Sequence, residues 1–188
     1  MPLTTLDANT ALLVVDLQKG ILGRPFAQPI ARTVARARAL LDAFRERGLP
    51  VVLINAAGVA PGRTEQPARL TGPLPEGFTD FVPELGQQLD DIVVTKWTWG
   101  AFATTDLEAR LEALGVTQVV VVGVATGTGV ESTARQAFEA GFNVTLAVDA
   151  MTDPRAEAHD YSLRSVFPRL GETGTAQDVI ELLARRSA

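Results

Sequence analysis

Five short runs of apolar residues, spaced along the chain, place the strongest limit on what this sequence can fold into. Each run is rich in Val, Leu or Ile and ends near a polar residue or a glycine; the runs are ALLVVD, PVVLIN, DIVVTK, QVVVVGV and NVTLAVD. Their apolar residues are continuous rather than alternating, which is typical of strands covered on both faces. The runs therefore predict a buried parallel β-sheet.

Helical patterns lie between these runs, and a short stretch near the end, GETGT, is a candidate sixth strand. We expect helices over residues 30–47, 105–114, 130–140, 155–170 and 175–186. The first three are each followed by a glycine, the residue that commonly ends a helix. Alternating strands and helices predict an α/β fold with right-handed crossovers. A length of 188 residues suits one domain, so we expect residues 1–188 to form a single domain.

Composition excludes several classes of function. A net charge of −5 argues against a nucleic-acid partner. The apolar runs are too short to span a bilayer, and the first residues lack the basic region of a secretory signal, so we expect no membrane partner and a cytoplasmic location. The sequence has no cysteine and one histidine, His159, so we expect no catalytic metal and no cofactor.

Three of the predicted strands end in residues that can carry chemistry. The first ends at Asp16, the DIVVTK strand ends at Lys96, and the QVVVVGV strand ends at Gly123 and runs into the glycine-rich turn ATGTG. Ligands of parallel sheets bind beyond the carboxyl ends of the strands, where the strand order reverses. We therefore expect an acid, a base and a glycine-rich turn to meet in one crevice.

Each of these residues also has a structural explanation. Asp16 can cap a turn, Lys96 can extend its amine to solvent, and the glycines can simply connect a strand to a helix. An Asp and a Lys at matching ends of neighbouring strands can instead form a partly desolvated pair, which is how a general acid or base is tuned. Backbone N–H groups at the start of the following helix can hold a developing negative charge.

Aromatic residues beside these strand ends are candidates to line a pocket. They are Phe26, Trp97, Trp99 and Phe102. Aromatic side chains more often belong to the core, and only for Trp99, three residues after the lysine on a connecting loop, is the pocket interpretation favoured.

Residues 57–90 interrupt the alternation of strands and helices. This segment holds five of the eleven prolines and several glycines, and it is long for a loop, so it is functional, mobile or an oligomer contact. Arg63 within it is a candidate to bind a substrate carboxylate, although a solvated loop residue is the simpler interpretation. We interpret His159, within a mixed helix, as a capping or core-edge residue.

Three stretches together resemble the isochorismatase-like hydrolases, also called the cysteine hydrolase superfamily. They are LLVVDLQKG, TKWTWGAFATTDLEARLEALGV and VVVVGVATGTGVESTARQAFEAGFNVTLAVDA, and in this order they extend over nearly the whole chain. The resemblance implies a three-layer α/β/α domain with a six-stranded parallel sheet, Rossmann-like, that assembles as a homodimer or homotetramer.

The resemblance also implies a catalytic set. The family's aspartate matches Asp16 and its lysine matches Lys96. The family pattern G-V-A-T-x-x-C-V reads here as GVATGTGV, so the nucleophilic cysteine of most members falls on Gly129. A cis peptide bond is implied between Val124 and Ala125.

We expect the substrate to lie against the turn and the nearby aromatic residues. The expected substrate-binding residues are Phe26, Trp99, Val124, Ala125 and Thr128.

Two hypotheses about function follow from Gly129, because a glycine cannot attack a substrate. In the first, the chain hydrolyses a small metabolite by acid–base chemistry of Asp16 and Lys96 without a thiol intermediate, and Gly129 leaves room for water or for substrate. True isochorismatases, which often have glycine at this position and hydrolyse a vinyl ether, are the model for it. In the second, the chain is a catalytically silent family member that binds a small molecule or serves as an assembly partner.

Overall fold

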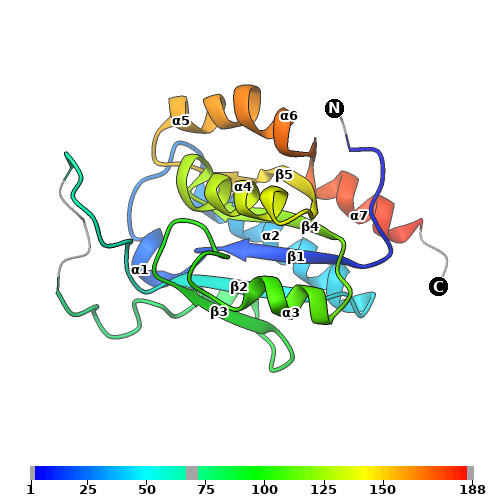
Figure 1. Ribbon diagram of the computed structural model, residues 1–188, viewed down its shortest axis with the longest axis horizontal. Coiled ribbons are helices and arrows are strands. Elements are labelled where there is room, and N and C mark those ends of the chain that lie inside the picture. The colour runs from blue at the N-terminus through cyan, green and yellow to red at the C-terminus, as the bar shows by residue number, and fades with distance from the viewer. Residues whose placement is uncertain (1–2, 67–71, 186–188) are drawn as a thin grey trace.

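Six parallel strands form the central sheet, in the order β3-β2-β1-β4-β5-β6 (Figure 1). The computed structural model describes residues 3–66 and 72–185. The strands are β1 (Thr10–Val15), β2 (Val51–Ala56), β3 (Ile92–Lys96), β4 (Gln118–Val124), β5 (Asn143–Thr152) and β6 (Glu172–Gly174). All five adjacent pairs are parallel, so the expected sheet, including the sixth strand at GETGT, is confirmed.

Helices cover both faces of the sheet, which explains the continuous apolar runs. On one face, α2 (Ile30–Glu46) and α7 (Ala176–Ala184) pack with Leu12 and Val14 of β1. On the other, α3 (Leu107–Ala113), α4 (Glu131–Glu139) and α6 (Phe167–Leu170) pack with Leu13 and Val15. Every residue of β1, β2 and β4 is buried. The three-layer α/β/α architecture is therefore confirmed.

The helix expected over residues 155–170 is divided into three parts. They are α5 (Ala156–Tyr161), a π-helical turn (Ser162–Val166) and α6. Pro168 lies in the first turn of α6 and has no N–H to donate, so one hydrogen bond of a continuous α-helix is missing there. A second π-helical turn (Thr126–Val130) precedes α4.

Two short helices were not expected from the pattern. They are α1 (Lys19–Leu22), directly after the first strand, and a 3₁₀ turn (Pro83–Leu85). The helix expected from residue 105 begins at Leu107, whose N–H donates to the Thr105 hydroxyl at 3.2 Å. Among the described residues, no helix is long and apolar enough to cross a membrane.

The described parts of the segment 57–90 leave the sheet and return to it beside α1 (Figure 1). The Ala57 amide donates to the Lys96 carbonyl at 2.9 Å where the segment begins. On the return, the Lys19 amide donates to the Asp80 carbonyl at 2.8 Å, and an antiparallel bridge joins Gln18 to Phe81. Both ends of the segment are thus bound to the carboxyl edge of the sheet, and a role in function, mobility or assembly stays a prediction.

Gly123 is essential to the pairing of β1 with β4 at this edge. It pairs with Val15 and has a φ of +115°, and a Cβ built on it would lie 2.0 Å from the Val15 carbonyl oxygen. We expect Gly123→Ala to lower the free energy of unfolding by about 3 kcal/mol, because the added methyl group must displace backbone. Urea denaturation measures this change. Gly62→Ala is the control, since a Cβ there meets no atom within 4 Å, and equal effects of the two substitutions would contradict this account.

Candidate active site

A buried ion pair lies at the carboxyl edge of the sheet. Asp16 follows β1 with a φ of +55°, and Lys96 is the last residue of β3. The Lys96 Nζ lies 2.9 Å from the Asp16 Oδ2, and the exposed fractions of the two side chains are 2% and 8%. The sequence pattern placed the two on neighbouring strands, but β2 lies between β1 and β3. The long lysine side chain spans that intervening strand end.

Burial controls the charge of Asp16. Desolvation raises its pKa from 3.8 to about 6, although the charge and hydrogen bond of Lys96 and the charge of Arg24 act in the opposite direction. The second carboxyl oxygen, Oδ1, is buried and has no hydrogen-bond partner among the described residues. Asp16 can therefore hold a proton close to neutral pH, as a general acid must.

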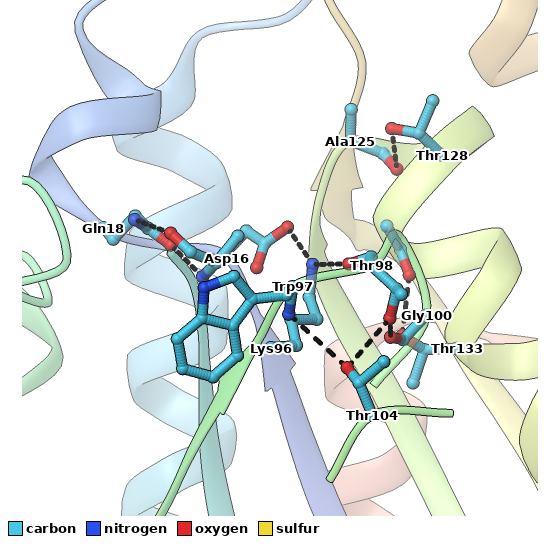
Figure 2. A network of polar contacts seen from close by, with 12 residues as sticks. Asp16, Gln18, Lys96, Trp97, Thr98, Gly100, Thr104, Ala125, Thr128 and Thr133 are labelled. Atoms are coloured by element: carbon cyan, nitrogen blue, oxygen red, sulfur yellow. Dashed lines mark hydrogen bonds and ion pairs between the residues drawn. The ribbon is translucent and has the colours of Figure 1, made fainter. Parts of the chain in front are cut away.

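The lysine is held from a second side by the loop that follows β3. Its Nζ also donates to the Thr98 carbonyl at 3.2 Å, as Figure 2 shows. The Thr98 hydroxyl in turn donates to the Gly100 carbonyl at 2.8 Å and lies 3.3 Å from the Thr104 hydroxyl. This network fixes the ammonium group between a carboxylate and a carbonyl.

The glycine-rich turn lies directly against the acid. A Cβ built on Gly129 would lie 2.9 Å from the Asp16 Oδ2 and 3.0 Å from the Val124 carbonyl oxygen. The Thr133 hydroxyl donates to the Gly129 carbonyl at 2.7 Å, and the bond between Val124 and Ala125 is cis, as the resemblance implies. The structure therefore brings the three predicted catalytic positions, Asp16, Lys96 and Gly129, together.

Three amides of the turn already have acceptors. Those of Thr128 and Val130 donate to the Ala125 carbonyl at 3.0 and 3.2 Å. The Gly127 amide donates to the Asp153 Oδ2 at 2.9 Å. The expectation that the turn presents its N–H groups to a developing negative charge is therefore wrong for these three, because each is bonded within the chain.

Asp153 is the site residue that the sequence pattern missed. It is 2% exposed, and besides Gly127 it accepts from the Arg155 amide at 2.9 Å, while its carbonyl accepts from the Ala27 amide at 2.9 Å. It lies just beyond β5, at the same edge as the catalytic pair. The predicted strand NVTLAVD stopped at Asp149, three residues before β5 ends at Thr152. The search for functional residues just after this strand therefore began too early and did not reach Asp153.

The predicted substrate-binding residues differ in their surroundings. Val124 and Ala125 are buried, and Thr128 is partly buried with its hydroxyl 3.5 Å from the Ala125 carbonyl oxygen. Phe26 is partly buried and packs against the core beneath α2. Trp99 is 61% exposed, so within a single chain it lies mostly in solvent.

The remaining candidates have structural or surface positions. Phe102 is a core residue whose ring lies 6.0 Å from that of Phe142, whereas Trp97 is 51% exposed. Arg63 is exposed. His159 is buried, and its Nδ1 lies 2.8 Å from the Thr126 hydroxyl, so it supports the turn from α5. Within the described part of the chain, no group of three or more histidine or acidic side chains is placed to hold a metal ion.

The contacts of Asp153 lead to a stability prediction. Asp153→Ala leaves two partly buried amides without a carboxylate acceptor, so we expect the free energy of unfolding to fall by about 1–3 kcal/mol. Asp160→Ala, which removes an exposed ion pair with Arg164, is the control, with an expected change below about 1 kcal/mol. Urea denaturation of both variants compares them, and a loss no larger for Asp153 than for Asp160 would disprove the anchoring role.

Comparison with known proteins agrees with this geometry. The Isochorismatase domain family matches residues 10–178. The chain is 39% identical to the isochorismatase family protein YwoC of Bacillus subtilis, over 92% of this chain and 93% of that protein. The structure of an isochorismatase family protein from Burkholderia thailandensis is 39% identical, with a TM-score of 0.90 over 96% of this chain and 98% of that one.

More distant relatives are named for a reaction. Nicotinamidase 3 of Arabidopsis thaliana is 32% identical over 83% of this chain and 79% of that protein. The isochorismatase of Bacillus subtilis is 26% identical over 97% of this chain and 61% of that protein. From the domain match and these similarities, the chain belongs to the isochorismatase family of hydrolases.

Proposed function

We propose that this chain hydrolyses a small metabolite by acid–base chemistry of Asp16 and Lys96, without a covalent bond to the protein. One observation carries the proposal. The Asp16 carboxyl is buried beside Lys96 and against Gly129, the position where the resemblance places the nucleophilic cysteine of other members. The chain has no cysteine, so a thiolate mechanism has no nucleophile, whereas the acid and its partner are intact.

The two charged residues have complementary tasks in this scheme. Asp16 holds a proton because burial raises its pKa to about 6, and its Oδ1 is the oxygen that Lys96 does not occupy. After the proton is given up, the ammonium group of Lys96, 2.9 Å from Oδ2, stabilises the carboxylate that remains. Proton donation then creates an ion pair and not an isolated buried charge.

Vinyl ether hydrolysis is the reaction that fits this acid best. Asp16 gives its proton to the terminal alkene carbon, and the positive charge is shared by the ether carbon and its oxygen. Water adds to that carbon and returns a proton to the carboxylate. The resulting hemiketal breaks its bond to the leaving oxygen, which yields a ketone and an alcohol. No step needs a nucleophile from the protein, and the isochorismatase relative is named for such a substrate.

The structural role that we propose for Gly129 differs from the role that the sequence suggested. Its missing side chain was expected to leave room for water or substrate, but the Cβ position lies 2.9 Å from the Asp16 Oδ2. The glycine instead allows the acid to lie against the backbone of the turn. A side chain at this position would require a small shift of the Asp16 carboxyl, which is the free end of a side chain.

A second candidate function, a silent family member that only binds, is favoured by the closure of the site. The Asp16 Oδ1 is buried, and among the described residues a hollow of about 390 Å³ lies at the opposite edge of the sheet, beside Gln118 and Asn143, where β4 and β5 begin. The intact pair argues against this candidate, because an unused buried ion pair is costly in desolvation.

The role of Asp16 can be tested with isochorismate and simple vinyl ethers. We expect Asp16→Asn to lower the turnover number by at least about 100-fold, because an amide of the same shape cannot donate the proton. The control is Asp80→Asn, at an exposed ion pair with Lys19, and it should retain activity.

Equal turnover by the wild type and Asp16→Asn would refute the role of the acid. A thermal-shift screen of metabolites separates the two candidate functions, provided that hits are followed by product analysis. A ligand that binds tightly and yields no product would favour the silent member.

The pH dependence provides an independent test. The reaction needs protonated Asp16, so kcat/KM should fall as the pH rises through about 6. The charge of Lys96 lowers the pKa of Asp16, so Lys96→Met should move this fall to higher pH. Lys19→Met, at an exposed lysine, should leave the profile in place. Profiles that coincide for the wild type and Lys96→Met would show that Asp16 is not the group that titrates.

A further inference from the structure

We propose that Gln136 is a positioning residue for the reaction: from α4 it fixes the loop after β3, and through that loop it fixes the ammonium group of Lys96. The inference rests on the proposed function, because it concerns the same acid and its partner. Neither the strand-end pattern nor the family resemblance indicated Gln136. A continuous series of contacts supports the assignment, from the glutamine side chain to the Asp16 carboxyl.

The Gln136 side chain holds the loop at two points. Its Oε1 accepts a hydrogen bond from the Phe102 amide at 2.9 Å. A Cβ built on Gly100 would collide with the amide group at the end of the Gln136 side chain, so that amide packs directly on the backbone of the loop. Gly100 and Phe102 are buried, and Gln136 is partly buried. The loop approaches α4 this closely because residue 100 has no side chain.

The same stretch of loop bonds to the lysine. The Thr98 hydroxyl donates to the Gly100 carbonyl at 2.8 Å, and the Thr98 carbonyl accepts from the Lys96 Nζ at 3.2 Å (Figure 2). The Lys96 Nζ lies 2.9 Å from the Asp16 Oδ2. Gln136 therefore reaches the catalytic pair through Gly100 and Thr98, and each step is a direct contact.

Helix α4 supports the glycine-rich turn as well as the loop. The Thr133 hydroxyl, one helical turn before Gln136, donates to the Gly129 carbonyl at 2.7 Å. Residues three apart lie on the same side of a helix. One side of α4 thus holds the turn against which the Asp16 carboxyl lies, and also the loop that binds Lys96. The helix therefore sets the turn and the loop at a fixed separation.

The position of the ammonium group matters because it affects the proton affinity of the acid. Desolvation raises the pKa of Asp16, and the charge and hydrogen bond of Lys96 oppose that effect. A lysine side chain has a flexible four-carbon stem, so its effect depends on what holds its Nζ. When the loop is released from α4, the ammonium group spends less time beside Oδ2, and the pKa of Asp16 rises further.

Two substitutions break the contact between Gln136 and the loop from opposite sides. Gln136→Met keeps the length of the side chain but cannot accept the Phe102 amide. Gly100→Ala leaves the glutamine in place, and its added methyl group displaces the side-chain amide. The controls are Gln177→Met, at an exposed glutamine of α7, and Thr10→Val, which removes buried hydrogen bonds at the other end of β1. Circular dichroism and thermal unfolding first confirm that each variant folds.

The test follows the titration of Asp16 in the full chain by NMR of its side-chain carboxyl carbon, assigned by its loss in Asp16→Asn. We expect the wild type to titrate at about pH 6. Gln136→Met and Gly100→Ala should each titrate about half a pH unit higher or more. Both controls should match the wild type, and Thr10→Val shows that lost stability alone does not move the midpoint. In a background of Lys96→Met, Gln136→Met should add no further shift, because it acts through the lysine.

Turnover of vinyl ethers gives a second measurement. Gln136→Met should lower kcat by about tenfold with little change in KM, because a misplaced catalytic group affects the transition state more than substrate binding. The fall of kcat/KM with pH should move upward together with the NMR midpoint. Gln136→Glu, which keeps an acceptor for the Phe102 amide, should retain most of the turnover that Gln136→Met loses.

The inference is overturned if Gln136→Met and Gly100→Ala titrate Asp16 as the wild type does, if Thr10→Val shifts the midpoint equally, or if the shift of Gln136→Met persists without Lys96. These outcomes do not depend on turnover. A shifted midpoint, together with equal turnover by the wild type and Asp16→Asn, would retain the positioning of Lys96 and reject the hydrolytic role. Turnover that needs Asp16, with an unshifted midpoint in both loop variants, would retain hydrolysis and reject the role of Gln136.

Discussion

The buried ion pair between Asp16 and Lys96 is the interaction on which the rest of the site depends. Its 2.9 Å distance requires the ends of β1 and β3 to be in register across β2, and it requires the loop after β3 to present the Thr98 carbonyl to the same ammonium group. Loss of one member of such a pair leaves the other charge buried, which typically costs about 3–5 kcal/mol. A change in the site that separates the two side chains is therefore expected to destabilise the folded chain as well.

Gly129 occupies the position of the family's nucleophile and lies in contact with the Asp16 carboxyl. Its Cβ position lies 2.9 Å from the Asp16 Oδ2, so any side chain there would push the carboxyl away from the turn. The carboxyl is buried at this position, and the desolvation raises its pKa.

Much of the fold and of the candidate site could be predicted from the sequence. Parallel strands covered on both faces appear in the sequence as continuous apolar runs, and the residues that follow these strands meet at one edge of the sheet. That reasoning located Asp16, Lys96 and the turn. It could not give the strand order, so the pair was assigned to neighbouring strands. It missed Asp153 because β5 continues through a register shift to Thr152, beyond the apolar run.

The pKa of Asp16 results from opposing effects of burial and of neighbouring cations. Burial without a cation would hold the proton too tightly for donation, whereas full pairing with cations would remove it before the substrate arrived. Lys96 favours the ionised carboxylate, and desolvation favours the protonated form. Asp153 ties the loop before α2 to the turn that lies against Asp16, through the amides of Ala27 and Gly127, so the surroundings of the acid are held by hydrogen bonds within the chain.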